Sequence, residues 1–143
     1  MGYSIAIAHT PDELERCFSV MKELRPHLDF DGFYSIYAES HKADGYEIAF
    51  VQKDGEVLAV MGYRFLCDMV RGRHLYIDDL VATEKARSQG YGAALLGFAE
   101  SVAKETGCPS LRLCAALENT GGIRFYERNG WTKRTFSFVK KTP

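Results

Sequence analysis

An excess of charge of either sign is missing from this sequence. Its 18 lysines and arginines nearly balance 19 aspartates and glutamates, which gives a formal net charge of -1. Proteins that bind nucleic acids or anionic membranes by general electrostatic attraction carry a surplus of basic residues. We therefore expect neither a nucleic acid nor a membrane as a partner.

Long apolar runs are missing as well. No run approaches the roughly 20 residues that span a bilayer, and residues 1–8 are too short and too mixed for a signal peptide. These two absences predict a cytoplasmic location.

The sequence also lacks the ligand spacings that are typical of a metal site. No C-x-x-C pair occurs, and the four histidines are scattered without an H-x-x-x-H grouping, so we expect no bound metal. The cysteines lie in apolar or element-edge contexts, which predicts reduced and mostly buried thiols. They are Cys17, Cys67, Cys108 and Cys114.

No linker, repeat or low-complexity segment interrupts the 143 residues. A chain of this length with 46% hydrophobic residues can bury a core of its own. We therefore expect a single domain over residues 1–143.

Hydrophobic periodicity and turn signals predict ten elements in the order βααβββαβαβ. Thr10 and Glu13 form a capping box at the start of the first helix. Asp54 and Gly55 mark a tight hairpin turn, and Gly107 ends a later helix. Strands are expected at residues 3–8, 47–52, 56–66, 74–82, 110–115 and 131–139, and helices at 11–26, 29–41, 91–106 and 122–129.

The most informative stretch joins the strand at 74–82 to the helix at 91–106. The strand carries two adjacent carboxylates, Asp78 and Asp79, and the connecting loop contains Arg87, Gly90 and Gly92. The first amides of a helix have no partner within it and lie at the positive end of its dipole, so they bind anions. Glycines let a phosphate approach these amides closely. This arrangement predicts a site for a phosphorylated ligand.

Two common phosphate-binding motifs do not fit this loop. A dinucleotide-binding loop would need a third glycine where Leu95 stands, and no Gly-Lys followed by Ser or Thr occurs. The loop does fit the pattern Arg/Gln-x-x-Gly-x-Gly/Ala, filled by Arg87, Gly90 and Gly92. At these residues the sequence resembles the GNAT superfamily of N-acetyltransferases, whose members bind the pyrophosphate of acetyl-CoA in this loop.

A second motif supports the same resemblance. Asn119-x-x-Gly122-x-x-Phe125-Tyr126-x-x-x-Gly130-Trp131 resembles the signature N-x-x-A-x-x-F-Y-x-x-x-G-F of that superfamily. The two departures, glycine for alanine and tryptophan for phenylalanine, keep the size class of each position. The two motifs have the separation and the order of elements found in the family, and together they cover about 60 residues.

The resemblance implies both a fold and a reaction. The fold is α/β (α+β), with a single mixed, mostly antiparallel sheet of six to seven strands flanked by about four helices. The reaction is transfer of the acetyl group of acetyl-CoA to a primary amine by direct attack in a ternary complex, without a metal. The alternative is a non-catalytic module that binds or senses acyl-CoA.

The resemblance also implies catalytic roles for an acid and a tyrosine. An alkyl ammonium must lose a proton before it attacks a thioester, and Asp78 or Asp79 lies where the family has a carboxylate for this step. Neighbouring strand residues point to opposite faces, so one of the two reaches the cleft unless a bulge turns the chain. We favour Asp78. Alternatively, both acids are solvated or paired with arginines: Arg64, Arg71 or Arg73.

Tyr126 holds the position of the family's general acid, which protonates the leaving thiolate. Alternatively, its hydroxyl only caps a backbone group while its ring packs under the cofactor. Asn119 is expected both to cap a helix and to contact the cofactor. The full set expected to bind acetyl-CoA is Leu80, Val81 and Ala82 through their backbone, Arg87, Ser88, Gln89, Gly90, Tyr91 and Gly92 in the loop, and Asn119 and Tyr126.

An aromatic segment precedes the second strand. Phe30, Phe33, Tyr34 and Tyr37 recur at helical spacing, which is typical of a short helix that packs on a sheet. In the family this helix pair lies over the acceptor side of the cleft, so side chains of this segment are expected to line the acceptor pocket. The residues expected to bind the acceptor are Phe30, Phe33, Tyr34 and Asp78. A small cationic amine and a peptide amine fit equally well. An apolar final strand could also pair two subunits as a homodimer.

Overall fold

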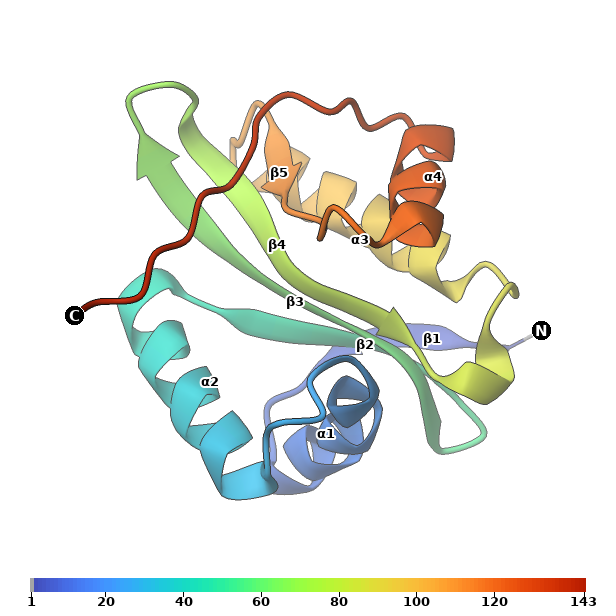
Figure 1. Cartoon of the computed structure of the whole chain (residues 1–143). Coiled ribbons are helices and arrows are strands. Elements are labelled where there is room, and N and C mark those ends of the chain that lie inside the picture. The colour runs from blue at the N-terminus through green and yellow to red at the C-terminus, as the bar shows by residue number, and fades with distance from the viewer. Residues whose placement is uncertain (1) are drawn as a thin grey trace. The chain divides into compact units, whose positions relative to one another are not determined.

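The computed structural model describes residues 2–143, which form two compact units joined in sequence after Arg112 (Figure 1). The first unit contains β1 (Ser4–Ile7), α1 (Pro11–Leu24), α2 (Phe30–Asp44), β2 (Glu47–Lys53), β3 (Glu56–Asp68), β4 (Gly72–Ala82), the 3-10 turn η1 (Glu84–Ala86) and α3 (Tyr91–Glu105). The short β5 (Leu111–Leu113) spans the junction, and the second unit contains α4 (Thr120–Arg128).

The first two helices begin at the residues that their sequences specify. Thr10 accepts a hydrogen bond from the amide of Glu13, and the Glu13 carboxylate accepts one from the amide of Thr10, at 3.1 and 3.0 Å. This reciprocal pair confirms the predicted capping box. Asp29 caps α2 through the amide of Gly32, and Gly45 ends it with a left-handed φ of 67°.

The strands form one sheet in the order β1-β2-β3-β4-β5, with antiparallel pairing from β1 to β4. Lys53 pairs with Glu56, so Asp54 and Gly55 form a two-residue hairpin loop. Both have positive φ, 53° and 77°, as a type I′ turn requires. The predicted hairpin is therefore confirmed.

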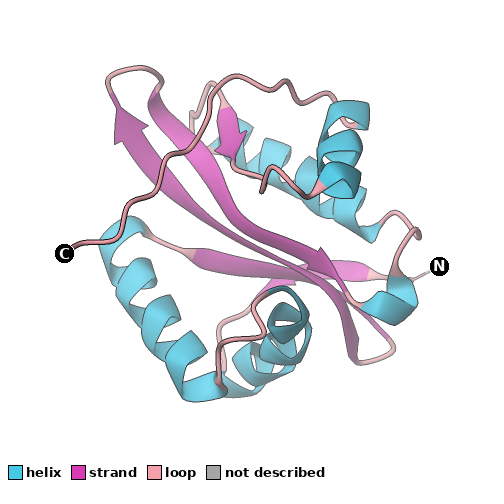
Figure 2. Ribbon diagram, viewed as in Figure 1, coloured by secondary structure: helices cyan, strands magenta, loops and turns pink. Residues whose placement is uncertain are grey.

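Helices cover both faces of this sheet (Figure 2). α1 and α2 lie on one face and α3 lies on the other. The side chains of α1 and α2 pack with β2 and β3 into a buried apolar cluster. Its members include Leu14, Met21, Phe33, Ile48 and Phe50.

A β-bulge interrupts the pairing of β3 with β4. Tyr63 pairs with Ile77, but the preceding residue of β3, Gly62, pairs with Asp79. Asp78 is therefore an extra residue in β4 at this point of the ladder. Such a bulge changes the direction in which the following side chains point, and bulges are over-represented beside active sites.

The prediction of six to seven strands is wrong, because the described sheet has five. The expected strand at residues 131–139 is absent, so the observed order is βααβββαβα. The alternation of Phe136 and Phe138 predicted a buried face, yet these side chains are 77% and 93% exposed. Alternation of apolar and polar residues specifies which side chains would share a face of a strand. It does not supply a neighbouring strand, and without one the backbone N–H and C=O groups cannot form the hydrogen bonds of a sheet.

The described residues 2–143 contain no helix that is long and apolar enough to cross a membrane. Within the same range, no group of three or more His, Cys, Asp or Glu side chains could hold a metal ion. The four cysteines are free thiols. Cys17 and Cys108 are buried while Cys67 and Cys114 are exposed, so the expectation of mostly buried thiols is half met.

Candidate functional site

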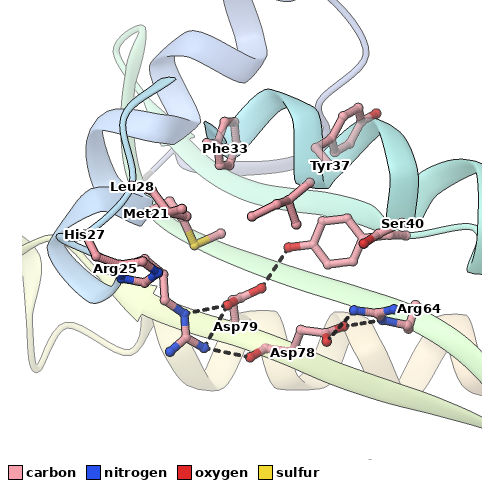
Figure 3. Close-up of a pocket in the computed structure, with 12 residues that line it drawn as sticks. Met21, Arg25, His27, Leu28, Phe33, Tyr37, Ser40, Arg64, Asp78 and Asp79 are labelled. Carbon is pink, nitrogen blue, oxygen red and sulfur yellow. Dashed lines mark hydrogen bonds and ion pairs between the residues drawn. The ribbon is translucent and has the colours of Figure 1, made fainter. Parts of the chain in front are cut away.

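The first unit contains a cavity of about 320 Å³ between α1, α2 and the strands β3 and β4 (Figure 3). One side of it is apolar and is formed by the two helices. The other side is charged and includes Asp78 and Asp79 from the bulge in β4. The lining residues are Met21, Arg25, His27, Leu28, Phe33, Ile36, Tyr37, Ser40, Tyr46, Arg64, Asp78 and Asp79.

Asp78 forms a two-pronged ion pair with Arg64. The Nε and Nη2 groups of Arg64 each donate to one carboxylate oxygen at 2.9 Å, and Nη1 donates to Asp44. Burial raises the pKa of the Asp78 carboxyl, and Arg64 opposes this shift without cancelling it. A carboxylate with a raised pKa is a better proton acceptor than an ordinary aspartate.

Asp79 is held by donors from two other elements. The Tyr46 hydroxyl donates to its Oδ2 at 2.8 Å, and Arg25 Nε donates to its Oδ1 at 3.0 Å. Arg25 follows the last residue of α1, and Tyr46 precedes β2, so the acid is fixed from both sides of the cavity. Burial and the negative charge of Asp79 raise the pKa of Tyr46 well above its usual value. The tyrosine therefore stays a proton donor to Asp79.

Gly62 makes the contact between Tyr46 and Asp79 possible. A Cβ at position 62 would lie 2.6 Å from Tyr46 Cζ and 2.8 Å from Asp79 Oδ2, and closer still to the Tyr46 hydroxyl. Any larger residue would therefore force this pair apart. The need for glycine here is a matter of space, because the φ of Gly62 lies outside the left-handed region.

Both acids line the cavity, because the bulge places Asp78 and Asp79 on the same side. Of the aromatic residues expected at the acceptor, Phe33 also lines it. Phe30 and Tyr34 are outside the described lining and stack against each other at 6.1 Å between ring centroids. The helical spacing identified the aromatic stripe. It did not determine which residues of the stripe face the cavity, because a rotation of the helix by about one residue changes that face.

The two residues that bond to Asp79 were not identified from the sequence. Arg25 and Tyr46 line the cavity, but neither was assigned a role in advance. Arg25 and Tyr46 meet Asp79 from positions 54 and 33 residues away along the chain, and no local pattern connects residues so distant in sequence. Tyr37, which belongs to the predicted aromatic stripe four residues after Phe33, also lines the cavity.

The loop after β4 leads to an uncapped helix start. Ser88 and Gly90 have positive φ of 64° and 85°, and no side chain caps α3 at Gly90. Among the described helices α1 to α4, the other three each have a side-chain cap, from Thr10, Asp29 and Asn119. The leading amides of α3 are therefore open to an external acceptor.

Arg87 precedes Gly90, the first residue of this helix start, by three positions and has a carboxylate neighbour. Its Nη2 is 3.6 Å from Glu23 Oε1, and its side chain is 57% exposed. Glu23 also accepts hydrogen bonds from the Thr83 hydroxyl at 2.6 Å and from the Glu84 amide at 3.0 Å. Glu23 thus connects α1 to the loop and reduces the positive charge of Arg87.

At its C-terminal end, β4 pairs with β3 along one edge. Leu80, Val81 and Ala82 pair with residues 59–61 of that strand. The other neighbour, β5, has 3 residues against 11 in β4, and the hydrogen bond from the Leu75 amide to the Ser110 carbonyl lies near the beginning of β4. A strand of three residues can cover only part of that edge.

The second unit carries the other two predicted site residues. Asn119 caps α4 by accepting a hydrogen bond from the Gly122 amide at 3.1 Å, as expected for a helix cap. Tyr126 is half-buried on α4, with its ring 5.3 Å from that of Phe125 and 6.2 Å from that of Trp131. Burial raises the pKa of Tyr126, so its hydroxyl keeps its proton at neutral pH.

The loop between β4 and α3 fits a diphosphate group. The uncapped amides of α3 supply donors, and the exposed guanidinium of Arg87 supplies positive charge. A Cβ built at Gly90 would meet nothing within 4 Å, but its φ of 85° excludes most other residues.

Comparison with known proteins gives a consistent result. A family model described as the acetyltransferase (GNAT) family matches residues 10–131. The uncharacterized N-acetyltransferase YhdJ of Bacillus subtilis is 28% identical over 130 residues, which are 90% of this chain and 92% of that protein. The aminoalkylphosphonate N-acetyltransferase of Salmonella typhimurium is 23% identical over 133 residues, or 92% of this chain and 86% of that protein.

A solved structure shares the fold. The structure of AAC(6')-Iy in complex with the bisubstrate analogue CoA-S-monomethyl-acetylneamine superimposes with a TM-score of 0.85. The two sequences are 18% identical, and the alignment covers 99% of this chain and 100% of the other.

Proposed function

Because the chain belongs to the acetyltransferase (GNAT) family, we propose that it transfers the acetyl group of acetyl-CoA to a primary amine. The observation that carries the proposal is the continuity of one segment. Its bulge presents Asp78 and Asp79 to a cavity, and the same strand continues through η1 and the loop after it to the uncapped start of α3. An acid pair and a diphosphate site on one continuous segment are the two parts that this transfer requires.

The reaction is a direct attack in a ternary complex. The ammonium form of the acceptor first loses a proton, and its nitrogen then forms a bond to the thioester carbonyl carbon. The bond from that carbon to sulfur breaks, the thiolate of CoA takes up a proton, and the nitrogen releases its second proton. The products are the amide, the free thiol of CoA and one proton in solution.

Asp78 is the proposed base. Its pKa is raised by burial, and it lies on the extra residue of the bulge at the cavity wall. Both carboxylate oxygens of Asp79 are fixed by hydrogen bonds, one from Tyr46 and one from Arg25, so we assign it the binding of the ammonium group. This division follows from the surroundings of the two acids, since Asp79 is held in place by these donors while burial makes Asp78 a better proton acceptor.

The remaining roles follow the family pattern. Backbone amides of Leu80, Val81 and Ala82 that point away from β3 would hold the pantetheine arm and stabilise charge on the carbonyl oxygen. Tyr126 would protonate the leaving thiolate, which its raised pKa permits at neutral pH. The proposed diphosphate contacts are Arg87, Ser88, Gln89, Gly90, Tyr91 and Gly92, with Asn119 as a further cofactor contact.

Two similar proteins support this choice of substrates. One relative is named for acetylation of aminoalkylphosphonates, and the neighbour AAC(6')-Iy was solved with an analogue that contains CoA. For this chain we propose acetyl-CoA and a small amine whose contacts include Phe33 and Tyr37. Phe30 and Tyr34 stay predictions at this site, as does the cytoplasmic location. Because the family match spans both compact units, we propose that they form one acetyltransferase domain.

The test is release of free thiol from acetyl-CoA on addition of an amine, followed with a thiol reagent. Activity should require an amine and should fall by about 10²-fold or more in Asp78→Asn, because a general base contributes at least that much. A variant at Glu15, an exposed residue of α1 outside the cavity, is the control, and Glu15→Gln should keep full activity. Binding of acetyl-CoA without thiol release for any amine would instead identify a non-catalytic acyl-CoA-binding module.

A further inference from the structure

The charged side of the cavity is balanced. Asp78 and Asp79 supply two negative charges, and Arg25 and Arg64 supply two positive charges. Each acid is already paired with one of these arginines at 2.9 Å. Among the described residues that line it, the cavity therefore offers no unpaired carboxylate that would attract a cation from solution.

The two arginines differ in how fully they are used. All three nitrogens of Arg64 donate to carboxylates, from Asp78 and Asp44. Arg25 bonds to Asp79 and to the Asp78 carbonyl through Nε and Nη2. Within residues 2–143, no acceptor bonds to its Nη1, and Figure 3 shows this nitrogen without a dashed line. The Arg25 side chain is 41% exposed, so a ligand can reach it.

The apolar side limits the size of the ligand. Met21, Leu28, Phe33, Ile36 and Tyr37 form this wall on α1 and α2 and on the turn between them. A cavity of about 320 Å³ holds on the order of ten non-hydrogen atoms if each takes the roughly 30 Å³ of a water molecule. A short carbon chain with a polar group at each end fills this space.

We propose that the acceptor is a small amine that carries an anionic group of its own, a carboxylate or a phosphonate, and that Arg25 binds this group through Nη1. This inference rests on the proposed acetyl transfer and adds the class of substrate. The ammonium end lies toward the two aspartates and the carbon chain lies on the apolar wall. The anion accepts a hydrogen bond from Nη1, the guanidinium nitrogen of Arg25 that has no other acceptor among the described residues.

The charge balance is the reason to expect this class. An amine with no other charge would lose its hydration and meet two carboxylates that arginines already neutralise. A zwitterionic amine brings one charge for the acids and one for Arg25, so the site stays neutral when occupied. Both desolvated charges then have a partner.

The experiment compares amines of matched length with wild-type protein and acetyl-CoA. The set is 5-aminopentanoate, 4-aminobutylphosphonate, pentylamine and 1,5-diaminopentane, each followed by release of the CoA thiol. A hydrogen-bonded charge pair is worth roughly 10- to 100-fold in affinity. We expect kcat/KM for one or both zwitterions to exceed that for pentylamine by about this factor. The carboxylate and phosphonate arms distinguish the two anions.

Variants separate recognition by Arg25 from a structural role. In Arg25→Gln the ratio of kcat/KM between the better zwitterion and pentylamine should fall to within a few-fold of one, while Arg25→Lys should keep part of it. Damage to the fold would lower both rates together and leave the ratio unchanged. Arg16→Gln is the matched control, because Arg16 lies on α1, the helix that Arg25 follows, pairs with Asp12 and does not line this cavity.

Two outcomes overturn the inference. Equal or faster turnover of pentylamine or 1,5-diaminopentane by the wild type would overturn it and leave acetyl transfer standing. An unchanged ratio in Arg25→Gln would also overturn it. No thiol release with any amine would remove the proposed function itself, which is a different result.

Discussion

Gly62→Ala tests whether the acid pair depends on the glycine opposite it. The added methyl group would lie 2.6 Å from Tyr46 Cζ and 2.8 Å from Asp79 Oδ2, so the ring or the carboxylate must move. Both are confined, since Tyr46 is 7% exposed and the Asp79 side chain 14%. Overpacking of this kind costs about 1–3 kcal/mol in the free energy of unfolding.

Tyr46→Phe gives the second corner of a double-mutant cycle. It removes the hydrogen bond of 2.8 Å to a buried carboxylate, which is worth about 1.5–3 kcal/mol. It also removes the oxygen atom nearest to the new methyl group and frees the ring from Asp79. Gly62→Ala should therefore cost less when Tyr46→Phe is already present, and the double variant should be about 1 kcal/mol more stable than the sum of the single effects.

Urea denaturation of the four proteins at one pH measures these free energies. Gly97→Ala is the matched control, since a Cβ at this position in α3 would meet nothing within 4 Å. That change should stabilise the protein by about 0.5–1 kcal/mol, because alanine favours a helix over glycine. A neutral Gly62→Ala, or single effects that add within about 0.3 kcal/mol, would refute the steric argument.

The further predictions concern acetyl-CoA binding, the proposed acid Tyr126 and the pKa of Asp78. Acetyl-CoA at about 100 times its dissociation constant should stabilise the wild type by about 2.7 kcal/mol in thermal unfolding. Gly90→Ala, strained at a φ of 85°, should require more acetyl-CoA for the same shift, and an equal response would contradict the diphosphate site. Tyr126→Phe should lower kcat by about 10²-fold or more, and a pH profile of kcat identical to that of the wild type would exclude an acid role. The raised pKa of Asp78 means that folding disfavours its charged form, so its contribution to stability is full below the unfolded pKa of about 3.9 and is lost as the pH rises. The stability of the wild type relative to Asp78→Asn in urea should thus increase from pH 7 to pH 4, and the opposite slope would contradict the shift.

Elements with a local chemical cause were predictable from the sequence. The capping box at Thr10 and Glu13 and the hairpin at Asp54 and Gly55 each depend on residues within a few positions, and both are confirmed. The family resemblance is likewise confirmed by the match over residues 10–131. The strand expected at residues 131–139 depended on a partner elsewhere, which alternation of side chains cannot specify.

The lining of the cavity was predictable along β4 and at Phe33 of α2, but not where residues distant in sequence meet. The sequence placed Asp78 and Asp79 next to each other and named a bulge as the condition for both to reach the cleft, and the bulge is present. It did not identify Arg25 or Tyr46, which hold Asp79 from distant parts of the chain. The need for glycine at position 62 could not be predicted from the sequence either, because it arises from the Tyr46 and Asp79 side chains that meet over this residue.

A substitution at Glu23 tests how the charge beside Arg87 affects binding of an anion to the loop. The Glu23 carboxylate accepts hydrogen bonds from the Thr83 hydroxyl and the Glu84 amide, which hold the loop in place. It also lies 3.6 Å from Arg87, where its charge repels a second negative group. The first effect favours acetyl-CoA binding and the second disfavours it. If Glu23 mainly competes for Arg87, then Glu23→Gln should strengthen acetyl-CoA binding, because the amide oxygen can still accept one of the two hydrogen bonds while the charge is gone.

The expected gain is small, because the Arg87 and Glu23 side chains are 57% and 30% exposed. An exposed ion pair is worth at most about 1 kcal/mol, which corresponds to about fivefold in the dissociation constant. Titration calorimetry at low salt should show this gain, and added salt should reduce it because exposed charges are screened. Glu56→Gln removes a carboxylate that pairs with Lys85 and is the control for a change of net charge alone. Weaker binding by Glu23→Gln, with Glu56→Gln unchanged, would show instead that Glu23 holds the loop in its binding conformation.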